Sequence, residues 1–140
     1  MGDLVEAGVE KVLINASGDI VLRGGKPEGG PWSIGIASPD DVEKYVKFFD
    51  VFDGSVATSG DYEKGAHIVD PHTGLIAIGA RSATVIGPDG AICDALATAL
   101  MVDGIDAQKW IGRAELAEYS FWTINRHDGT AWSYGANKGY

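Results

Sequence analysis

The chain has little of several residue types, and each shortage excludes a class of protein. Its one cysteine, Cys93, excludes an internal disulfide and a zinc site built from cysteines. Only 11 lysines and arginines stand against 20 aspartates and glutamates, which gives a net charge of −9. Diffuse electrostatic capture of nucleic acid or of an anionic membrane is therefore not expected, and no nucleic-acid partner is predicted.

Long apolar runs and export signals are missing as well. No segment approaches the roughly 20 consecutive apolar residues that cross a bilayer as a helix. The N-terminus has no basic region followed by an apolar stretch and a small-residue cleavage site, so the chain as given is predicted to be cytoplasmic. Apolar residues make up 45% of its 140 residues, which predicts one domain, residues 1–140, with a substantial core.

Glycine, in contrast, is abundant, and its 20 copies recur where apolar segments end. The pattern predicts a helix tail at residues 3–8, a clear helix at residues 91–102 and a second helix from Asp106 to about Leu116. Asp53-Gly54 and Asp128-Gly129 are tight-turn signals that predict hairpins. The fold class is α+β, a mostly antiparallel sheet with a helical pair near the C-terminus. Strands are predicted at residues 12–14, 20–22, 32–36, 45–52, 55–58, 81–86, 120–125 and 131–134.

Two oxygen-bearing side chains stand four residues apart in the predicted helix of residues 91–102. Asp94 and Thr98 face the same side, and oxygen pairs suit a hard cation. A structural role is the alternative, because Asp94 in the first turn suits the helix dipole and Thr98 can bond back to a carbonyl. Magnesium takes about six oxygens, so two from the protein leave positions for water and a ligand phosphate. The pair therefore predicts a metal-assisted site for a phosphate-containing ligand.

A second cluster spans residues 67–74. Pro71 keeps Asp70 out of helical conformation, and Asp70 and Thr73 are placed to bond backbone amides in a rigid turn. His67 is a candidate general base, because a neutral imidazole beside a bound phosphate can take a proton from an incoming hydroxyl. A lone histidine between two apolar residues is more often structural, and both interpretations remain open here.

Two turns are further candidates for contacting a ligand. The segment of residues 15–19 follows a strand and would present backbone amides to a phosphate or to a flavin edge. The segment of residues 58–62 is rich in hydroxyls and offers Asp61 as a hydrogen-bond acceptor. Each signal is weak by itself, because many turns between strands have this composition. Serine catalysis is not expected, since the chain has no Gly-x-Ser-x-Gly elbow.

In their order and spacing these segments resemble the C-terminal half of the ApbE family, the FAD:protein FMN transferases once described as thiamine-biosynthesis lipoproteins. The most specific parts are the histidine-to-glycine stretch of residues 67–74 and the Asp-Ala-x-Ala-Thr helix that begins at Asp94. The family fold resembles paired α+β modules of T-fold type, and this chain corresponds to the second. The matching segments are residues 13–20, 31–36, 56–62, 67–74, 83–86 and 94–100, which together cover most of the chain.

The resemblance implies an enzyme that splits FAD across its pyrophosphate, with magnesium, or calcium as the alternative ion, as the metal. FMN is attached to a threonine hydroxyl of a target flavoprotein, and AMP leaves. The matched positions imply that Asp94 and Thr98 hold the metal and that His67 and Asp70 carry the base chemistry. The implied flavin-nucleotide contacts are Ser17, Gly18, Asp19, Ser59, Gly60, His67, Ile68 and Thr73.

Two departures from the family pattern are visible. Ser17 stands where the family usually has glycine, which adds a hydroxyl and narrows the approach of a ligand to the backbone. The upstream half of the family, which supplies a Lys-Gly segment, a further metal ligand and much of the adenine pocket, has no match in these residues. Family members are often exported and membrane-anchored through a signal that would lie before residue 1. The alternative hypothesis is a non-catalytic module that binds flavin nucleotide or metal, or a homo-oligomer formed through an exposed apolar face.

Overall fold

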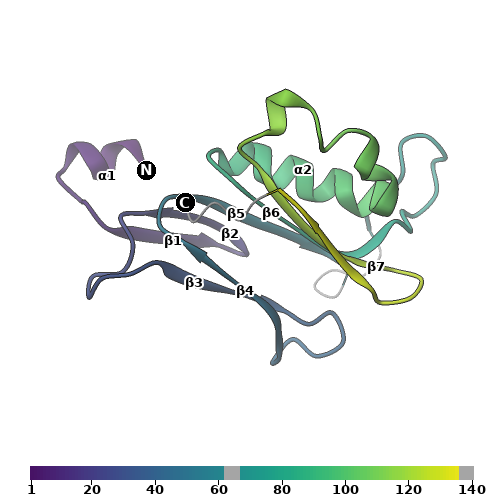
Figure 1. The fold of residues 1–140 in the computed structure, drawn as a ribbon, viewed down its shortest axis with the longest axis horizontal. Coiled ribbons are helices and arrows are strands. Elements are labelled where there is room, and N and C mark those ends of the chain that lie inside the picture. Colours follow the sequence, from purple (N-terminus) through teal and green to yellow (C-terminus); the bar gives the residue numbers. More distant parts are fainter. Residues whose placement is uncertain (62–66, 136–140) are drawn as a thin grey trace.

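The computed structural model describes residues 1–61 and 67–135, which form three layers (Figure 1). A six-stranded antiparallel sheet in the order β1-β2-β5-β6-β7-β8 is covered on one face by a helix and on the other by a two-stranded sheet, β3-β4. The elements are α1 (Gly2–Glu6), β1 (Val12–Ala16), β2 (Asp19–Arg23), β3 (Trp32–Ala37), β4 (Tyr45–Val51), β5 (Gly54–Gly60), β6 (Ala80–Gly87), α2 (Gly90–Asp103), the 3-10 helices η1 (Gly104–Lys109) and η2 (Ala114–Leu116), β7 (Ser120–Asn125) and β8 (Ala131–Tyr134).

The large sheet has an apolar core on each of its faces. Successive side chains of a strand point to opposite faces, so Val85 of β6 packs toward α2 while its neighbour Ile86 packs toward β3 and β4. The helix contributes Ala97 and Leu100 to the first core, and both are fully buried. β6 is buried along nearly its whole length because it is a central strand with a layer on each side.

The predicted fold class is confirmed, and so are the predicted strands and the helix of residues 91–102. Asp89 caps α2, because its Oδ1 accepts a hydrogen bond of 3.0 Å from the backbone N–H of Ile92. Gly104 ends the helix with a positive φ of 54°, which glycine adopts readily, and its N–H bonds to the Leu100 carbonyl. The predicted hairpin at Asp128-Gly129 is confirmed by the antiparallel pairing of β7 with β8.

The second helix, predicted from Asp106 to about Leu116, is instead two short 3-10 helices, η1 and η2. The chain turns sharply at Gly104, and the segment then folds back on α2. Trp110 fixes this return: its Nε1 donates a 2.7 Å hydrogen bond to Asp103 Oδ2, and its ring meets Phe121 edge-on. These tertiary contacts override the helical pattern of the segment, so the helical pair consists of α2 and a 3-10 partner.

The hairpin predicted at Asp53-Gly54 is wrong. β4 pairs with β3 in the small sheet, whereas β5 pairs with β2 and β6 in the large sheet. Asp53 Oδ1 accepts a 3.0 Å hydrogen bond from the Gly24 N–H, and Gly54 adopts φ 120°. The Asp-Gly pair therefore carries the chain from one layer to the next. A turn signal in a sequence marks a change of direction and does not say which strands pair afterwards.

The outer face of the small sheet carries two exposed aromatic side chains. Tyr45 and Phe48 are 60% and 56% exposed, and their ring centroids lie 5.3 Å apart over Gly35. The predicted self-association through an exposed apolar face stays a prediction. Within residues 1–61 and 67–135, no helix has the length and apolar character needed to span a membrane.

Candidate functional site

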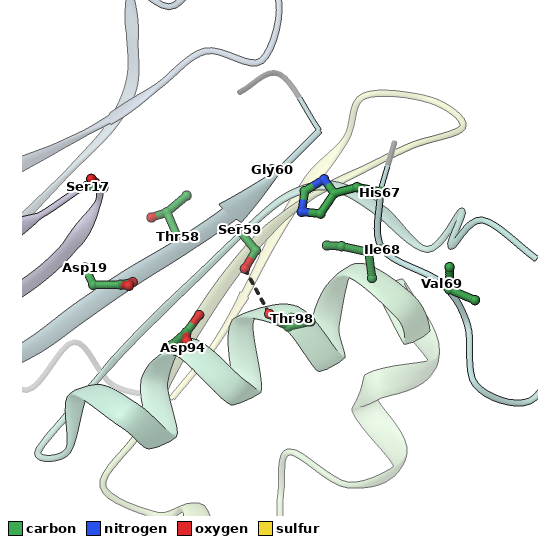
Figure 2. Close-up of a pocket in the computed structure, with 10 residues that line it drawn as sticks. All are labelled: Ser17, Asp19, Thr58, Ser59, Gly60, His67, Ile68, Val69, Asp94 and Thr98. Atoms are coloured by element: carbon green, nitrogen blue, oxygen red, sulfur yellow. Dashed lines mark hydrogen bonds between the residues drawn. The ribbon is translucent and has the colours of Figure 1, made fainter. Parts of the chain in front are cut away.

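A cavity of about 420 Å³ lies between β5, α2 and the end of the β1–β2 hairpin (Figure 2). β2 pairs with β5 from Gly54 to Val56, and β5 then continues to Gly60 beside β6, past the tip of the hairpin. This step in the sheet leaves the space. Its volume is within the range of about 300–1,000 Å³ that is typical of small-molecule sites. The lining residues are Ser17, Asp19, Thr58, Ser59, Gly60, His67, Ile68, Val69, Asp94 and Thr98.

Helix α2 brings Asp94 and Thr98 to the cavity, as the four-residue spacing predicts. Both side chains are exposed and lie one turn apart on the side of α2 that faces β5 (Figure 2). The Thr98 hydroxyl lies 3.3 Å from the Ser59 hydroxyl across the cavity, within hydrogen-bond distance. Ala97, the residue before Thr98, is fully buried against the sheet and holds the helix in place. Asp94 and Thr98 are therefore presented to the cavity by a firmly packed element.

The charge of the cavity bears on what it can bind. Its described lining includes two carboxylates, Asp19 and Asp94, and neither lysine nor arginine. A pyrophosphate would be repelled by such a lining unless a cation came with it. The carboxylate of Asp94 and the hydroxyl of Thr98 are hard oxygen donors of the kind that magnesium takes. In the described part of the chain no group of three or more histidine, cysteine, aspartate or glutamate residues is placed to hold a metal ion.

The β1–β2 turn supplies the second wall. Ser17 and Gly18 form a two-residue turn between the paired Ala16 and Asp19, with φ values of 55° and 101°. Ser17 and Asp19 line the cavity, and their contacts with a flavin nucleotide stay predictions. Gly18 is not among the lining residues, and its N–H donates a 2.9 Å hydrogen bond to Asn15 Oδ1 inside the turn. The assignment of Gly18 to flavin contact stays a prediction.

The end of β5 forms the floor of the cavity. Ser59 and Gly60 line it, as expected, while Tyr62, the last residue of that hydroxyl-rich cluster, lies outside the described residues. Thr58 also lines the cavity, and its hydroxyl lies 2.9 Å from the hydroxyl of Thr84, which is fully buried in β6. No role for Thr58 alone is predicted from the sequence. What marks it is its position opposite Thr84 on the neighbouring strand, and this pairing is known only once the strand register is known.

His67 and Ile68 stand at the start of a short hairpin beside the cavity, and both line it. The Ala77 N–H donates to the Ile68 carbonyl at 2.9 Å, and Val69 pairs with Ile76. Figure 2 shows the His67 imidazole on the same side of the cavity as Ser59. The exposed imidazole is therefore placed where it can meet a ligand in the cavity. Val69 is a lining residue that sequence reasoning missed.

Asp70 and Thr73 lie at the tip of this hairpin and are not among the residues that line the cavity. Asp70 accepts a 2.8 Å hydrogen bond from the His72 N–H and a 3.0 Å hydrogen bond from the Thr73 hydroxyl. These bonds, chiefly the one from the His72 N–H, lower the pKa of Asp70 below its usual value of 3.8. The two residues build the rigid turn that the sequence predicts. Their parts in base chemistry and flavin contact stay predictions.

Comparison with known proteins gives a consistent result. A sequence model of the ApbE family matches residues 2–120. The chain is 34% identical over 125 residues to a curated FAD:protein FMN transferase of Escherichia coli (strain K12), covering 81% of this chain and 36% of that protein. It is 35% identical over 111 residues to the FAD:protein FMN transferase of Vibrio cholerae, covering 72% of this chain and 33% of that one.

Solved structures agree with the sequence relatives. The crystal structure of the ApbE protein from Thermotoga maritima matches with a TM-score of 0.74 at 32% identity, covering 87% of this chain and 42% of that chain. The flavin transferase ApbE from Vibrio cholerae matches with a TM-score of 0.74 at 29% identity, covering 97% of this chain and 46% of that chain. The chain thus spans about a third of the length of these curated relatives and less than half of these structures.

Proposed function

Because the chain belongs to the ApbE family, we propose that it is a flavin transferase domain that binds FAD and attaches FMN to a threonine of a target flavoprotein, releasing AMP. One observation carries the proposal. The cavity gathers an acidic and a hydroxyl side chain from α2, the end of β5 and an exposed histidine from a separate hairpin, all distant in sequence. These are the groups that transfer of a phosphoryl-linked flavin to a hydroxyl requires: a place for a cation, hydrogen-bonding groups and a base.

The binding step depends on charge compensation. Asp94 and Thr98 would hold a magnesium ion, which, when bound, supplies the positive charge that offsets the pyrophosphate and the charge developing at phosphorus. The hydroxyls of Ser17 and Ser59 are placed to donate hydrogen bonds to the nucleotide, and Ile68 offers an apolar wall. Asp70 and Thr73 lie beyond the lining residues, so their proposed contacts concern the part of FAD that extends past the cavity.

The transfer step needs a base near the acceptor hydroxyl. We assign that role to His67, whose imidazole would accept the proton of the acceptor threonine. The threonine oxygen then forms a bond to the phosphorus of the FMN portion, the bond from that phosphorus to the bridging oxygen breaks, and AMP carries that oxygen away. The turn built by Asp70 holds the hairpin on which His67 stands, which is how Asp70 contributes to this step.

Calorimetric titration with FAD, first with magnesium and then with EDTA, tests the binding step. Micromolar binding that requires magnesium is the expected result, and Asp94→Ala should abolish it while far-UV circular dichroism shows the helix intact. Asp50→Ala, an exposed carboxylate on β4, is the matched control and should bind as the original chain does. Unchanged metal-dependent binding in Asp94→Ala would refute the metal assignment, and no binding by the original chain in either buffer would refute FAD binding by this domain.

Covalent transfer is tested with an acceptor flavoprotein that carries the threonine. Flavin fluorescence that stays with the acceptor after denaturation is the expected product. His67→Ala should abolish it, whereas His72→Ala, an exposed histidine on the same hairpin, should not. FAD binding without any transfer by the original chain would favour the alternative, a non-catalytic module.

A further inference from the structure

An ion pair lies directly behind the wall that carries His67. Arg126, the residue after β7, places Nη1 2.8 Å from Asp61 Oδ2, and its Nη2 donates a 2.9 Å hydrogen bond to the carbonyl of Ala80. The guanidinium therefore ties together the end of β5, the start of β6 and the end of β7. The two charged side chains are 25% and 21% exposed, so water screens them less than it screens a pair on the open surface.

A small void beside this ion pair shares part of its lining with the large cavity. Its volume is about 10 Å³, and its walls include Arg126, Asp61, His67 and Ile68. Gly60 borders both spaces. On the side away from the large cavity, His67 and Ile68 are therefore packed close to the Arg126–Asp61 pair. The space between them holds at most about one water molecule. A shift of either charged side chain would enlarge this void and remove packing from the side of His67 that borders it.

The pairing also fixes the chain at the point where β5 gives way to the segment that carries His67. Asp61 follows the last residue of β5, and its N–H bonds to the Arg81 carbonyl at 3.4 Å. On the other side, the Ile68 carbonyl accepts a bond from Ala77. The backbone is therefore held by a hydrogen bond at Asp61 and by another at Ile68. At Asp61 it is also held by the ion pair with Arg126.

From this geometry we propose that Arg126 is a positioning residue for His67, acting through its ion pair with Asp61. The catalytic meaning of this role rests on the proposed function, but the position of the imidazole does not. A partly buried ion pair adds little to stability compared with an apolar pair of similar volume, but removing one partner leaves the other charge unpaired and is itself destabilising. Loss of Arg126 is therefore expected to cost stability as well as to release the end of β5 beside His67.

The first test is spectroscopic and does not need activity. In two-dimensional ¹H–¹³C spectra of the full chain, the imidazole resonances of His67 should move in Arg126→Gln toward their positions in the urea-unfolded protein. Arg126→Lys, which keeps the charge, should restore them in large part. The control is Lys44→Gln. Lys44 pairs with Asp41 at 2.8 Å and borders neither cavity, so its loss should leave His67 unmoved.

The second test separates positioning from binding. Arg126→Gln should lower kcat for FMN transfer by about 10- to 100-fold, since a misplaced catalytic group is costly, while the dissociation constant for FAD changes by less than about threefold. If Arg126→Gln does not fold, Asp61→Asn, which keeps the volume and one hydrogen bond, takes its place in both tests.

The spectroscopic result tests the positioning role of Arg126 independently of the proposed transferase function. His67 resonances that coincide with those of the original chain in both Arg126→Gln and Asp61→Asn would overturn it. So would an equal displacement in Lys44→Gln, because the effect would then not depend on the Arg126–Asp61 pair. If the original chain neither binds FAD nor transfers FMN, the proposed function fails, and the resonances still decide whether Arg126 positions His67.

Discussion

Replacing Ala97 by valine probes the packing that presents α2 to the cavity. Ala97 is fully buried between α2 and the sheet, in the same cluster as Leu100 and Val85. Valine adds two methyl groups to a position already in contact with β-strand side chains, and overpacking of this kind costs about 1–3 kcal/mol. The lower helix propensity of valine adds less than about 0.7 kcal/mol. The expected loss in the free energy of unfolding is therefore about 1–4 kcal/mol.

Ala95→Val is the matched control for Ala97→Val. Ala95 lies in the same helix but is exposed, so it should lose only the propensity term of about 0.5 kcal/mol. Urea unfolding followed by circular dichroism at 222 nm and by tryptophan fluorescence measures both variants, and equal slopes confirm that the comparison is valid. Equal losses in the two variants would refute the packing of α2 through Ala97, and with it the basis for placing Asp94 and Thr98 at the cavity.

Three other predictions follow from single residues. Gly79→Ala should cost about 2 kcal/mol or more, because its Cβ would lie 2.3 Å from the Val102 carbonyl oxygen; a melting temperature equal to that of the original chain would contradict this. Burial raises the pKa of Cys93 to about 12, so a thiol reagent at pH 8 should modify it only on unfolding, and rapid labelling of the native chain would show otherwise. The pKa of Asp70 is lowered by the His72 N–H, so its contribution to the hairpin is complete above the unfolded value of 3.8 and is lost as the pH falls through the lower folded value. Amide exchange of residues 67–77 should accelerate over that window, and Asp70→Asn should remove the step.

Much of the fold can be predicted from the sequence because its signals are local. β7 and β8 illustrate this: short apolar runs on either side of Asp128-Gly129 predict a hairpin, and the structure has it. The layer change at Asp53-Gly54 cannot be predicted in this way, because the same two residues serve a hairpin and a crossing between sheets equally well. The 3-10 geometry of η1 depends on the contact of Trp110 with Asp103, which is tertiary.

The same distinction, between local signals and contacts between distant segments, applies to the candidate site. Asp94 and Thr98 could be paired from the sequence because a helix fixes the relation of residues four apart. The hydrogen bond between Thr58 and Thr84 depends on strand register and could not be. The ion pair between Arg126 and Asp61 likewise depends on bringing β5 and β7 to the two sides of β6. Contacts across a sheet carry no fixed spacing along the chain, so a single sequence does not reveal them.

The two-stranded layer of β3 and β4 forms its own small sheet and rests on the six-stranded sheet through side chains such as Phe49 and Val51. It can therefore lift away without breaking the hydrogen-bonded ladders of the large sheet, at a cost set by the apolar area that it uncovers. We expect this layer to open as a separate cooperative unit, below the free energy of global unfolding. The cavity lies with α2 on the large sheet, so the domain can lose one of its two cores transiently and keep its candidate site assembled.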